Sequence, residues 1–260
     1  MIITKDNGTK HQLINADCLS LDLNDIMDKT VFDLVLTDLP YGTTKCKWDQ
    51  VIDLEKMWKW LPLFTYEDTP ILLFAQTPFD KVLGSSNIRN LKYEWIWEKT
   101  SATGHLNAKK MPMKCHENIL VFYKKLPLYN PQKTSGHVRK TAYKGEHLQS
   151  DVYNKTKNNT YYDSTDRYPR DVLKFASDKQ KLNIHSTQKP LELLRYMIRT
   201  YTNEGDTVLD FTAGSMSVAV AAYLEGRNSV CIEMDTEQYN KSVEWVKNCS
   251  FDEPYKANNQ

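Results

Sequence analysis

The sequence lacks the features that mark several common classes of protein. Its 260 residues contain no uncharged apolar run long enough to span a bilayer, and the first six residues, MIITKD, do not form a signal peptide. The five cysteines are scattered, and no two of them have the spacing of a zinc site. We therefore expect a cytoplasmic protein with reduced thiols, no membrane association and no bound metal.

Net charge is also nearly absent, but the charges are unevenly distributed. The formal charge of the whole chain is +1. Residues 99–181 contain 17 Lys and Arg against 7 Asp and Glu, a net charge of +10, so the rest of the chain carries −9. A basic middle segment favours a polyanionic partner, although a solvated lysine-rich insertion has the same composition.

The most informative stretch follows an apolar run at residues 31–36 (VFDLVL), which is typical of a buried parallel strand. The next six residues, TDLPYG, contain a proline and a glycine that end the strand abruptly. Ligands of open α/β sheets bind at the carboxyl ends of the strands. We therefore expect a binding site here, although so short a motif can also be an ordinary strand-to-loop turn.

The side chains of that turn favour one kind of chemistry. The Asp38 carboxylate and the Leu39 carbonyl can accept the two hydrogens of an amino group, and Pro40 stiffens the backbone beside them. The Tyr41 ring can stack on a flat heterocycle. This set of groups suits a reaction at the exocyclic amine of a nucleobase.

A second ligand-binding pattern lies nearer the C-terminus. A strand at residues 207–209 leads into a turn of small residues at 210–217 (DFTAGSMS) and a helix at 218–225. A second strand follows at residues 229–232 and ends at an acid, residue 233. In a βαβ nucleotide-binding unit the turn lets the backbone approach the ligand, and the acid, here Glu233, bonds ribose hydroxyls. Glycine is scarce, however, because only Gly214 occupies a turn that usually carries two or three.

The rest of the pattern alternates buried strands with amphipathic helices, so we expect an α/β protein. A strand at residues 11–15 leads to Asp17, which can accept a hydrogen bond from a ligand amino group or simply cap the following helix. Asp235 is expected to cap a last helix. The other predicted elements are strands at residues 70–75, 93–97 and 119–123 and helices at residues 53–64, 191–201 and 236–247.

Residues 124–182 differ in character, since they are polar, basic and tyrosine-rich with little apolar periodicity. Basic side chains interleaved with rings suit phosphate contacts and base stacking, so this segment is the candidate for DNA recognition. A disordered linker is the alternative. The candidate DNA-binding residues are Lys133, Arg139, Lys140, Lys144, Arg167 and Arg170.

In type and order, these stretches resemble the β-class of amino-methylating DNA methyltransferases, which use S-adenosylmethionine. Residues 38–41 (DLPY) are similar to the catalytic Asp-Pro-Pro-Tyr motif of that family, and residues 183–190 (NIHSTQKP) to its Asn-x-His-Pro-Thr-Gln-Lys-Pro motif. Residues 209–217 (LDFTAGSMS) resemble Leu-Asp-Pro-Phe-Ala-Gly-Ser-Gly-Thr, with Met216 at the second glycine. The catalytic motif comes first, which is the circularly permuted order of the β-class. Lesser similarities lie at residues 15–18 (NADC), 116–122 (HENILVF), 168–173 (YPRDVL) and 232–233 (IE).

The resemblance implies a Rossmann-like, S-adenosylmethionine-dependent methyltransferase fold with a mostly parallel, doubly wound sheet. It implies a single methyltransferase domain at residues 1–260, composed of a catalytic half (1–124), an inserted target-recognition segment (125–182) and a cofactor-binding half (183–260). The implied catalytic residues are Asp38, Leu39, Pro40 and Tyr41. The implied cofactor-binding residues are Asp17, Cys18, Asp38, His185, Thr187, Lys189, Asp210, Thr212, Ala213, Gly214, Ser215 and Glu233.

The activity that the resemblance implies is site-specific methylation of the N6 amine of a flipped-out adenine in double-stranded DNA. Methylation of cytosine N4 is the nearest alternative, and Asp38 rather than serine at the first motif position favours adenine. A catalytically silent nucleic-acid-binding homologue and a nicotinamide dehydrogenase are further alternatives; the missing glycines argue against the dehydrogenase. The resemblance also implies a bacterial or phage protein, monomeric or homodimeric, and allows for a restriction endonuclease as partner.

Overall fold

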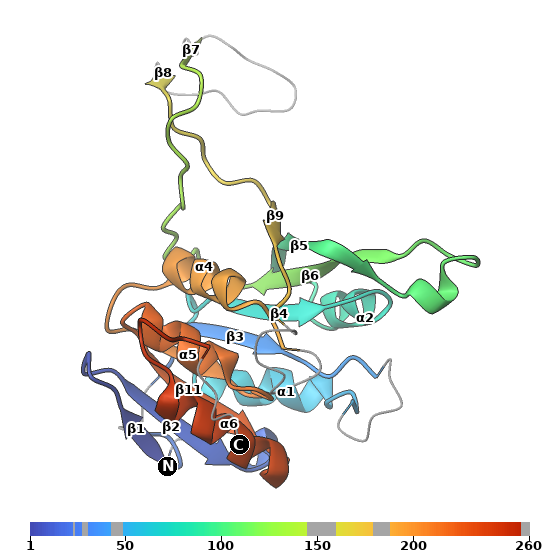
Figure 1. The fold of residues 1–260 in the computed structure, drawn as a ribbon, viewed down its shortest axis with the longest axis vertical. Coiled ribbons are helices and arrows are strands. Elements are labelled where there is room, and N and C mark those ends of the chain that lie inside the picture. The colour runs from blue at the N-terminus through green and yellow to red at the C-terminus, as the bar shows by residue number, and fades with distance from the viewer. Residues whose placement is uncertain (23, 28–30, 43–48, 145–159, 179–187, 256–260) are drawn as a thin grey trace. The chain divides into compact units, whose positions relative to one another are not determined.

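The computed structural model describes residues 1–22, 24–27, 31–42, 49–144, 160–178 and 188–255 (Figure 1). The chain forms two compact units. The larger unit comprises Met1–Asn130 and Asp171–Gln260, and the smaller unit is Pro131–Arg170. Among the described residues, no helix has the length and apolar character needed to cross a membrane.

The larger unit is built on a nine-stranded sheet. Its strands are β1 (Ile2–Thr4), β2 (Lys10–Asn15), β3 (Leu34–Asp38), β4 (Ile71–Ala75), β5 (Leu91–Thr103), β6 (Lys114–Phe122), β9 (Val172–Phe175), β10 (Thr207–Asp210) and β11 (Asn228–Glu233). Their spatial order is β1-β2-β11-β10-β3-β4-β6-β5-β9. Five of the eight pairings are parallel, so the sheet is mostly parallel, as the sequence predicts.

Helices cover both faces of this sheet, which makes it doubly wound. One apolar core contains side chains of α4 (Leu191–Tyr201), α5 (Ser217–Leu224) and α6 (Thr236–Asn248), and the other contains side chains of α1 (Leu54–Trp60) and α2 (Phe79–Ser86). Successive side chains of a strand point to opposite faces. Accordingly, Leu34 and Leu36 of β3 belong to the first core, and Val35 between them belongs to the second.

The caps of the helices follow from the sequence. The Asp235 carboxylate accepts a hydrogen bond from the Gln238 N–H over 2.8 Å, so the predicted cap of α6 is confirmed. At the start of α4, the Leu191 N–H donates to the Asp178 carboxylate over 2.8 Å. Every residue of α5 is buried, which explains why that helix has no polar face.

The observed elements differ from the predicted ones in several places. β3 spans Leu34–Asp38 rather than residues 31–36, so Asp38 is the last residue of the strand and does not lie in the turn after it. The predicted helix at residues 53–64 ends early, because Pro62 lies in a 3₁₀ turn, η3 (Leu61–Leu63). Five helices or strands were not predicted: β1, α2 with its weak helix formers (FDKVLGSS), and the three strands within the polar segment, β7 (Lys140–Lys144), β8 (Thr160–Ser164) and β9.

The smaller unit contains β7 (Lys140–Lys144) and β8 (Thr160–Ser164), which pair in an antiparallel two-stranded sheet. An isolated antiparallel bridge joins Thr134 to Arg167. A two-stranded sheet buries little apolar surface, so its stability depends strongly on local polar contacts.

Candidate active site

Five parallel strands, β2, β11, β10, β3 and β4, have their carboxyl ends at one edge of the sheet. β10 and β3 are neighbours, and the chain winds away from them in opposite directions, through α5 to β11 and through α1 to β4. Such a reversal is a topological switch point, where ligands of open α/β sheets bind. The two predicted motifs, residues 37–42 and 210–217, meet there.

Hydrogen bonds join the two motifs directly. The Thr212 hydroxyl donates to the Asp38 carbonyl over 3.0 Å. The Thr37 hydroxyl donates to Asp210 Oδ1 over 2.5 Å and accepts from the Phe211 N–H over 2.9 Å. Asp38 therefore lies beside the turn predicted to hold the cofactor. Thr212, a departure from the family motif, provides one of the contacts between the motifs.

The Asp38 carboxylate has a partner on each oxygen. Oδ1 accepts from the Tyr41 hydroxyl over 2.8 Å, and Oδ2 accepts from Lys189 Nζ over 2.6 Å. A carboxylate has about four lone-pair sites, so both oxygens can accept a further hydrogen bond. The side chain is 27% exposed and thus accessible to a ligand. Burial raises the pKa of Asp38, although Lys189 opposes that effect.

A buried chain of alternating charges extends from Asp38. Lys189 Nζ also lies 3.1 Å from Glu117 Oε2, and Lys99 Nζ lies 2.5 Å from Glu117 Oε1. Burial by itself raises the pKa of Glu117, but Lys189 and Lys99 outweigh burial and lower it to about 2. Burial lowers the pKa of Lys189, yet Asp38 and Glu117 raise it above its usual value. The two lysines and two carboxylates thus alternate along the cluster, and each carboxylate is in contact with at least one ammonium group.

Tyr41 is fixed from several sides. Its ring stacks on Phe79 with the centroids 5.6 Å apart, and burial raises the pKa of its phenol well above the usual value, so the hydroxyl stays a donor. The following residue, Gly42, has φ of +66°, and its N–H donates to Asp49 over 2.8 Å. A Cβ on Gly42 would lie 2.8 Å from Val51 Cγ2, so glycine is needed here for both conformation and space.

The turn between β10 and α5 is left-handed at two residues. Gly214 has φ of +49°, and Met216, at the position of the family's second glycine, has φ of +58°. A non-glycine residue in this conformation costs about 1–2 kcal/mol. The Met216 side chain is fully buried in the core that contains α5, and that burial offsets the cost. The chain thus forms the turn without the second glycine.

Two acids lie at neighbouring strand ends beside this turn. The Glu233 carboxylate accepts from the Gly214 and Asp235 N–H groups, each over 2.8 Å, and burial raises its pKa. The Asp17 carboxylate accepts from the Leu19 N–H over 3.0 Å and so caps the 3₁₀ turn η1 (Cys18–Ser20). Capping was one of the two roles predicted for Asp17, and binding of a ligand amino group was the other. The second carboxylate oxygen of Asp17 has no partner among the described residues. Cys18 is buried, which raises the pKa of its thiol to about 12 and keeps it neutral.

Other predicted cofactor residues are engaged within the turn. The Ala213 N–H donates to the Ile232 carbonyl over 2.9 Å, and the Ser215 and Ser217 hydroxyls are 2.6 Å apart. His185 and Thr187 lie outside the described residues.

The residues around this turn fit a nucleoside-containing cofactor. Glu233 and Asp17 keep acceptor sites for hydroxyl and amino hydrogens, and the space in front of Gly214 is open, because an added Cβ would meet nothing within 4 Å. A separate feature is Gln188, which precedes Lys189: it is only 3% exposed, yet neither polar atom of its side chain has a partner among the described residues. A buried, unpaired amide costs about 1–3 kcal/mol, so a polar ligand group beside it would be stabilising.

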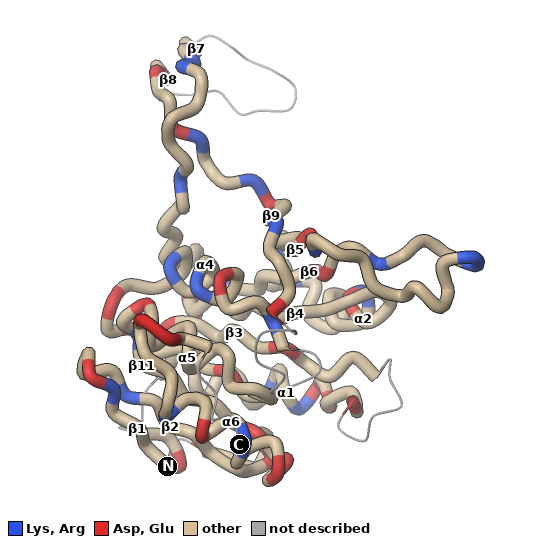
Figure 2. The backbone as a smooth tube through the Cα atoms, in the orientation of Figure 1, with Lys and Arg blue, Asp and Glu red and all other residues tan. Residues whose placement is uncertain are grey.

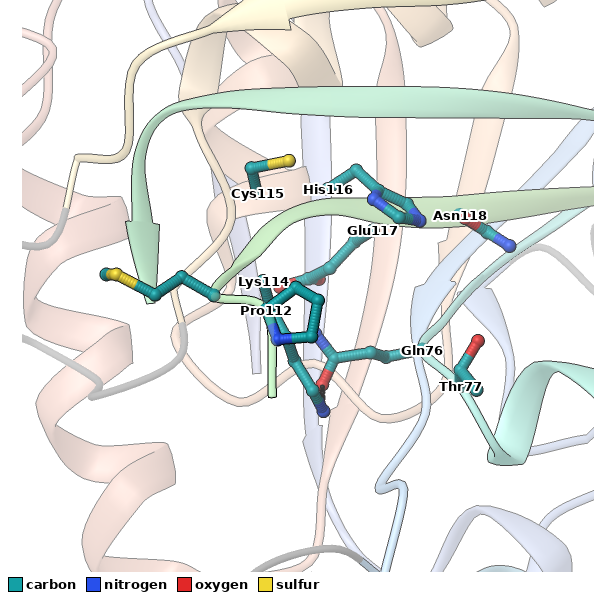
Figure 3. A pocket seen from close by; sticks show the side chains of 9 residues that line it. Gln76, Thr77, Pro112, Lys114, Cys115, His116, Glu117 and Asn118 are labelled. Atoms are coloured by element: carbon teal, nitrogen blue, oxygen red, sulfur yellow. Dashed lines mark hydrogen bonds between the residues drawn. The ribbon is translucent and has the colours of Figure 1, made fainter. Parts of the chain in front are cut away.

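A pocket of about 310 Å³ lies beside the charged cluster (Figure 3). It opens between the residues after β4 and the strand β6, and Glu117 borders both the pocket and the cluster. Lys114 Nζ donates to Gln76 Oε1 across it over 3.0 Å. The lining residues are Gln76, Thr77, Pro112, Met113, Lys114, Cys115, His116, Glu117 and Asn118.

The predicted DNA-binding residues all belong to the smaller unit, where they differ in their partners. Arg139 forms an ion pair with Asp163, and Arg167 donates to the backbone carbonyls of Val138 and Asp166. The remaining side chains are more accessible. Lys133 Nζ lies 4.5 Å from the Tyr168 ring centre, Lys140 and Arg170 are exposed, and the Lys144 side chain is outside the described part.

The fold and the site define the class of the protein. Its sheet order, switch point and paired motifs are those of a Rossmann-like, S-adenosylmethionine-dependent methyltransferase fold. The structure of M1.HpyAVI in complex with SAM is similar, with a TM-score of 0.62 and 22% identity, over 92% of this chain and 99% of that one. The cytosine-N4-specific PvuII DNA methyltransferase is similar with a TM-score of 0.64 and 16% identity, over 94% and 89%.

Comparison of the sequence with known families and proteins identifies the family of the chain. The model of the N6/N4 DNA methylase family matches residues 32–244, so the chain belongs to that family. The type II methyltransferase M1.MboII of Moraxella bovis is 27% identical over 252 residues, which cover 85% of this chain and 90% of the relative. The chain is therefore an amino-methylating DNA methyltransferase, and S-adenosylmethionine is its methyl donor.

Two residues of the cluster were not among the predicted site residues. Glu117 belongs to the stretch HENILVF, which resembles a family pattern but assigns no role to this glutamate. Lys99 gave no signal in the sequence, because its position beside Glu117 depends on the pairing of β5 with β6.

The pKa of Asp210 yields a test of the site. Burial raises this pKa to about 7, whereas an unfolded aspartate ionises near pH 3.9. The native state thus holds a proton that the unfolded state loses between about pH 4 and pH 7, so the free energy of unfolding should fall as pH rises through that interval. In Asp210→Asn this contribution should vanish, and the variant should gain stability relative to the parent up to about pH 7.

Urea denaturation at successive pH values measures this difference. Asp252→Asn, which changes an exposed carboxylate in the same way, is the control. A stability difference between Asp210→Asn and the parent that does not change with pH would contradict the raised pKa.

Proposed function

We propose that this methyltransferase acts on the N6 amine of adenine in DNA. The observation that carries the proposal is the position of the Asp38 carboxylate, which has accepting capacity on both oxygens and lies beside the turn at residues 210–217. Asp38 rather than serine at the first motif position supports adenine over cytosine. Cytosine N4 is the second candidate, since it presents a similar aromatic amine.

An aromatic amine is a poor nucleophile, because its lone pair is delocalised into the ring. Asp38 and the Leu39 carbonyl would accept its two hydrogens and favour a pyramidal nitrogen with a freed lone pair. Among the described residues no group donates to the Leu39 carbonyl, so that oxygen is available. Tyr41 would align the base. The N–H proton becomes acidic only once the N–C bond has formed, so Asp38 need not be a strong base.

The cofactor would bind at the carboxyl ends of β2, β11 and β10. When bound, it supplies an electrophilic sulfonium methyl group. Asp17 would bond its adenine amine, Glu233 its ribose hydroxyls, and Gly214 with its neighbours would surround the methionine portion. Attack requires the amine and the methyl carbon about 3–3.5 Å apart in line, so this holding of both partners is a large part of the catalysis.

In this proposal Glu117 is a positioning residue. Lys189 alone would form a full ion pair with Asp38 and would occupy its carboxylate. Glu117 competes with Asp38 for the ammonium group, since its Oε2 lies 3.1 Å from Lys189 Nζ. The same oxygen lies 3.4 Å from the Tyr41 hydroxyl. Lys189 and Tyr41 are thereby held in place while Asp38 keeps its accepting capacity.

The target base lies inside the duplex and must be flipped out, at a cost of a few kcal/mol. The smaller unit, Pro131–Arg170, is proposed to read the DNA. Its exposed Lys140 and Arg170 are suited to phosphate contacts, and its exposed Tyr143 and Tyr161 to stacking or groove contacts.

The target base can be identified directly. We expect DNA from cells that express this chain to contain N6-methyladenine at one sequence context. Nucleoside mass spectrometry distinguishes that product from N4-methylcytosine, and sequencing of the modified positions gives the context. Detection of N4-methylcytosine alone would overturn the adenine assignment and establish the second candidate.

We expect Asp38→Ala to abolish methyl transfer while S-adenosylmethionine binding survives, because the variant removes the acceptor of the amine hydrogens. The fold should persist, since Lys189 keeps Glu117 as a partner. Transfer of a labelled methyl group measures the first effect and calorimetry the second. Activity near that of the parent would exclude Asp38 from the reaction.

We expect Glu117→Gln to lower kcat by up to about 100-fold, the effect of a modest misplacement of catalytic groups. The negative charge of Glu117 contributes to the raised pKa of Asp38, so its removal should also move the acidic limb of the pH–kcat profile to lower pH. The control is Glu98→Gln, which breaks an exposed ion pair with Lys174. If activity fell but the acidic limb of the pH–kcat profile stayed at the same pH, Glu117 would have only a structural role.

A further inference from the structure

The hairpin between β5 and β6 extends beyond the body of the sheet (Figure 1). Glu98 pairs with His116, Thr103 pairs with Lys114, and the register shifts between these two pairs. All residues from 101 to 116 are exposed. From Glu98 to the tip at Gly104 the ribbon reaches about 20 Å, at about 3.3 Å per residue. A segment with no buried side chain adds nothing to the core, so its residues need another explanation.

The charge of this hairpin is of one sign. Residues 101–116 contain three lysines, two histidines and no acid. Lys109 and Lys110 have no carboxylate partner in the part of the chain that the structure describes. Figure 2 shows the basic residues at the tip of the hairpin. Such a ribbon is complementary to a polyanion.

The tip also presents large apolar side chains. Gly104, with φ of +91°, leads into the 3₁₀ turn η4 (His105–Asn107), which places Leu106 at its centre. Leu106 is 96% exposed, and Met111 is 53% exposed. An apolar side chain close to lysines is a combination with which proteins enter a base step while they contact the phosphates around it.

The hairpin is continuous with the active site. Its β6 strand leads from Lys114 through the pocket to Glu117, which contacts Lys189 and Tyr41. Both the hairpin and the cluster belong to the larger unit. Any contact that the tip makes with DNA is therefore made by the same ribbon that helps to position the catalytic groups.

We infer that the β5–β6 hairpin is a DNA-contacting wedge. Leu106 enters the base stack next to the target and takes the space that the flipped base leaves, and Lys109 and Lys110 bind phosphates on either side. The inference rests on DNA being the substrate, which family membership gives, and not on the choice of adenine. It holds equally if the target base proves to be cytosine.

Leu106→Ala tests the wedge with two duplexes that carry the methylated sequence, one fully paired and one with an abasic site opposite the target. We expect kcat/KM to fall about tenfold or more on the paired duplex and less than about twofold on the other, because flipping costs least for an unpaired base. Ile88→Ala, which truncates a side chain that is 68% exposed outside the hairpin, should change neither value.

Equal losses on both duplexes, or no loss on either, would overturn the wedge. If the chain methylated no DNA at all, both duplexes would be silent for the parent as well, which distinguishes failure of the proposed function from failure of this inference. Because Leu106 is not buried, circular dichroism of the variant should match that of the parent.

The phosphate contacts have a separate test. In the double variant Lys109→Gln/Lys110→Gln, the slope of log Kd against log salt for the paired duplex should decrease by about 2, since each phosphate contact contributes about 0.9. The control is Lys56→Gln/Lys59→Gln, which removes two exposed lysines of α1. An unchanged slope in the hairpin variant would exclude these lysines from the interface.

Discussion

The Lys189 ammonium group lies between two carboxylates, and the arrangement of the active site depends on that position. A buried charge is costly unless opposite charges and hydrogen bonds surround it. Here the order Lys99, Glu117, Lys189, Asp38 alternates in sign, so each buried group compensates its neighbour. Removal of one member changes the charge balance of the remaining three. The environment of the Asp38 carboxylate is therefore set by Lys189 together with Glu117 and Lys99.

These four residues come from distant parts of the chain: the end of β3, β5, β6 and the segment before α4. They meet only when the sheet has closed with β4, β6 and β5 in order beside β3. The cluster around Asp38 therefore forms only in the complete sheet. The turn at residues 210–217 has a more local character, since β10, α5, β11 and α6 around it are consecutive in the sequence, and only the contacts from Thr37 and Asp38 come from a distant strand.

That difference explains how much the sequence could predict. The position of Asp38 after a buried strand and the turn around Gly214 follow from local patterns, and the mostly parallel sheet follows from the resemblance to the methyltransferase family. The partners of Asp38 do not, because the link between Glu117 and Lys99 depends on strand pairing. Met216 is a similar case, because the burial of its side chain in the core, which offsets the cost of its left-handed backbone, depends on tertiary packing. Residues 124–182 have little apolar periodicity, which is why β7, β8 and β9 were not predicted there.

The boundaries of the smaller unit have an evolutionary consequence. The chain leaves the larger unit after Asn130, whose backbone N–H donates to the Thr200 carbonyl and whose side-chain amide donates to the Thr202 carbonyl. It re-enters at Asp171, whose carbonyl accepts from the Ile96 N–H over 2.7 Å. Both attachment points are held by bonds to backbone groups of the larger unit, and neither uses a side chain of the cluster around Asp38. Residues 131–170 can accordingly be lengthened, shortened or replaced as a cassette during evolution, with the chemical machinery unchanged.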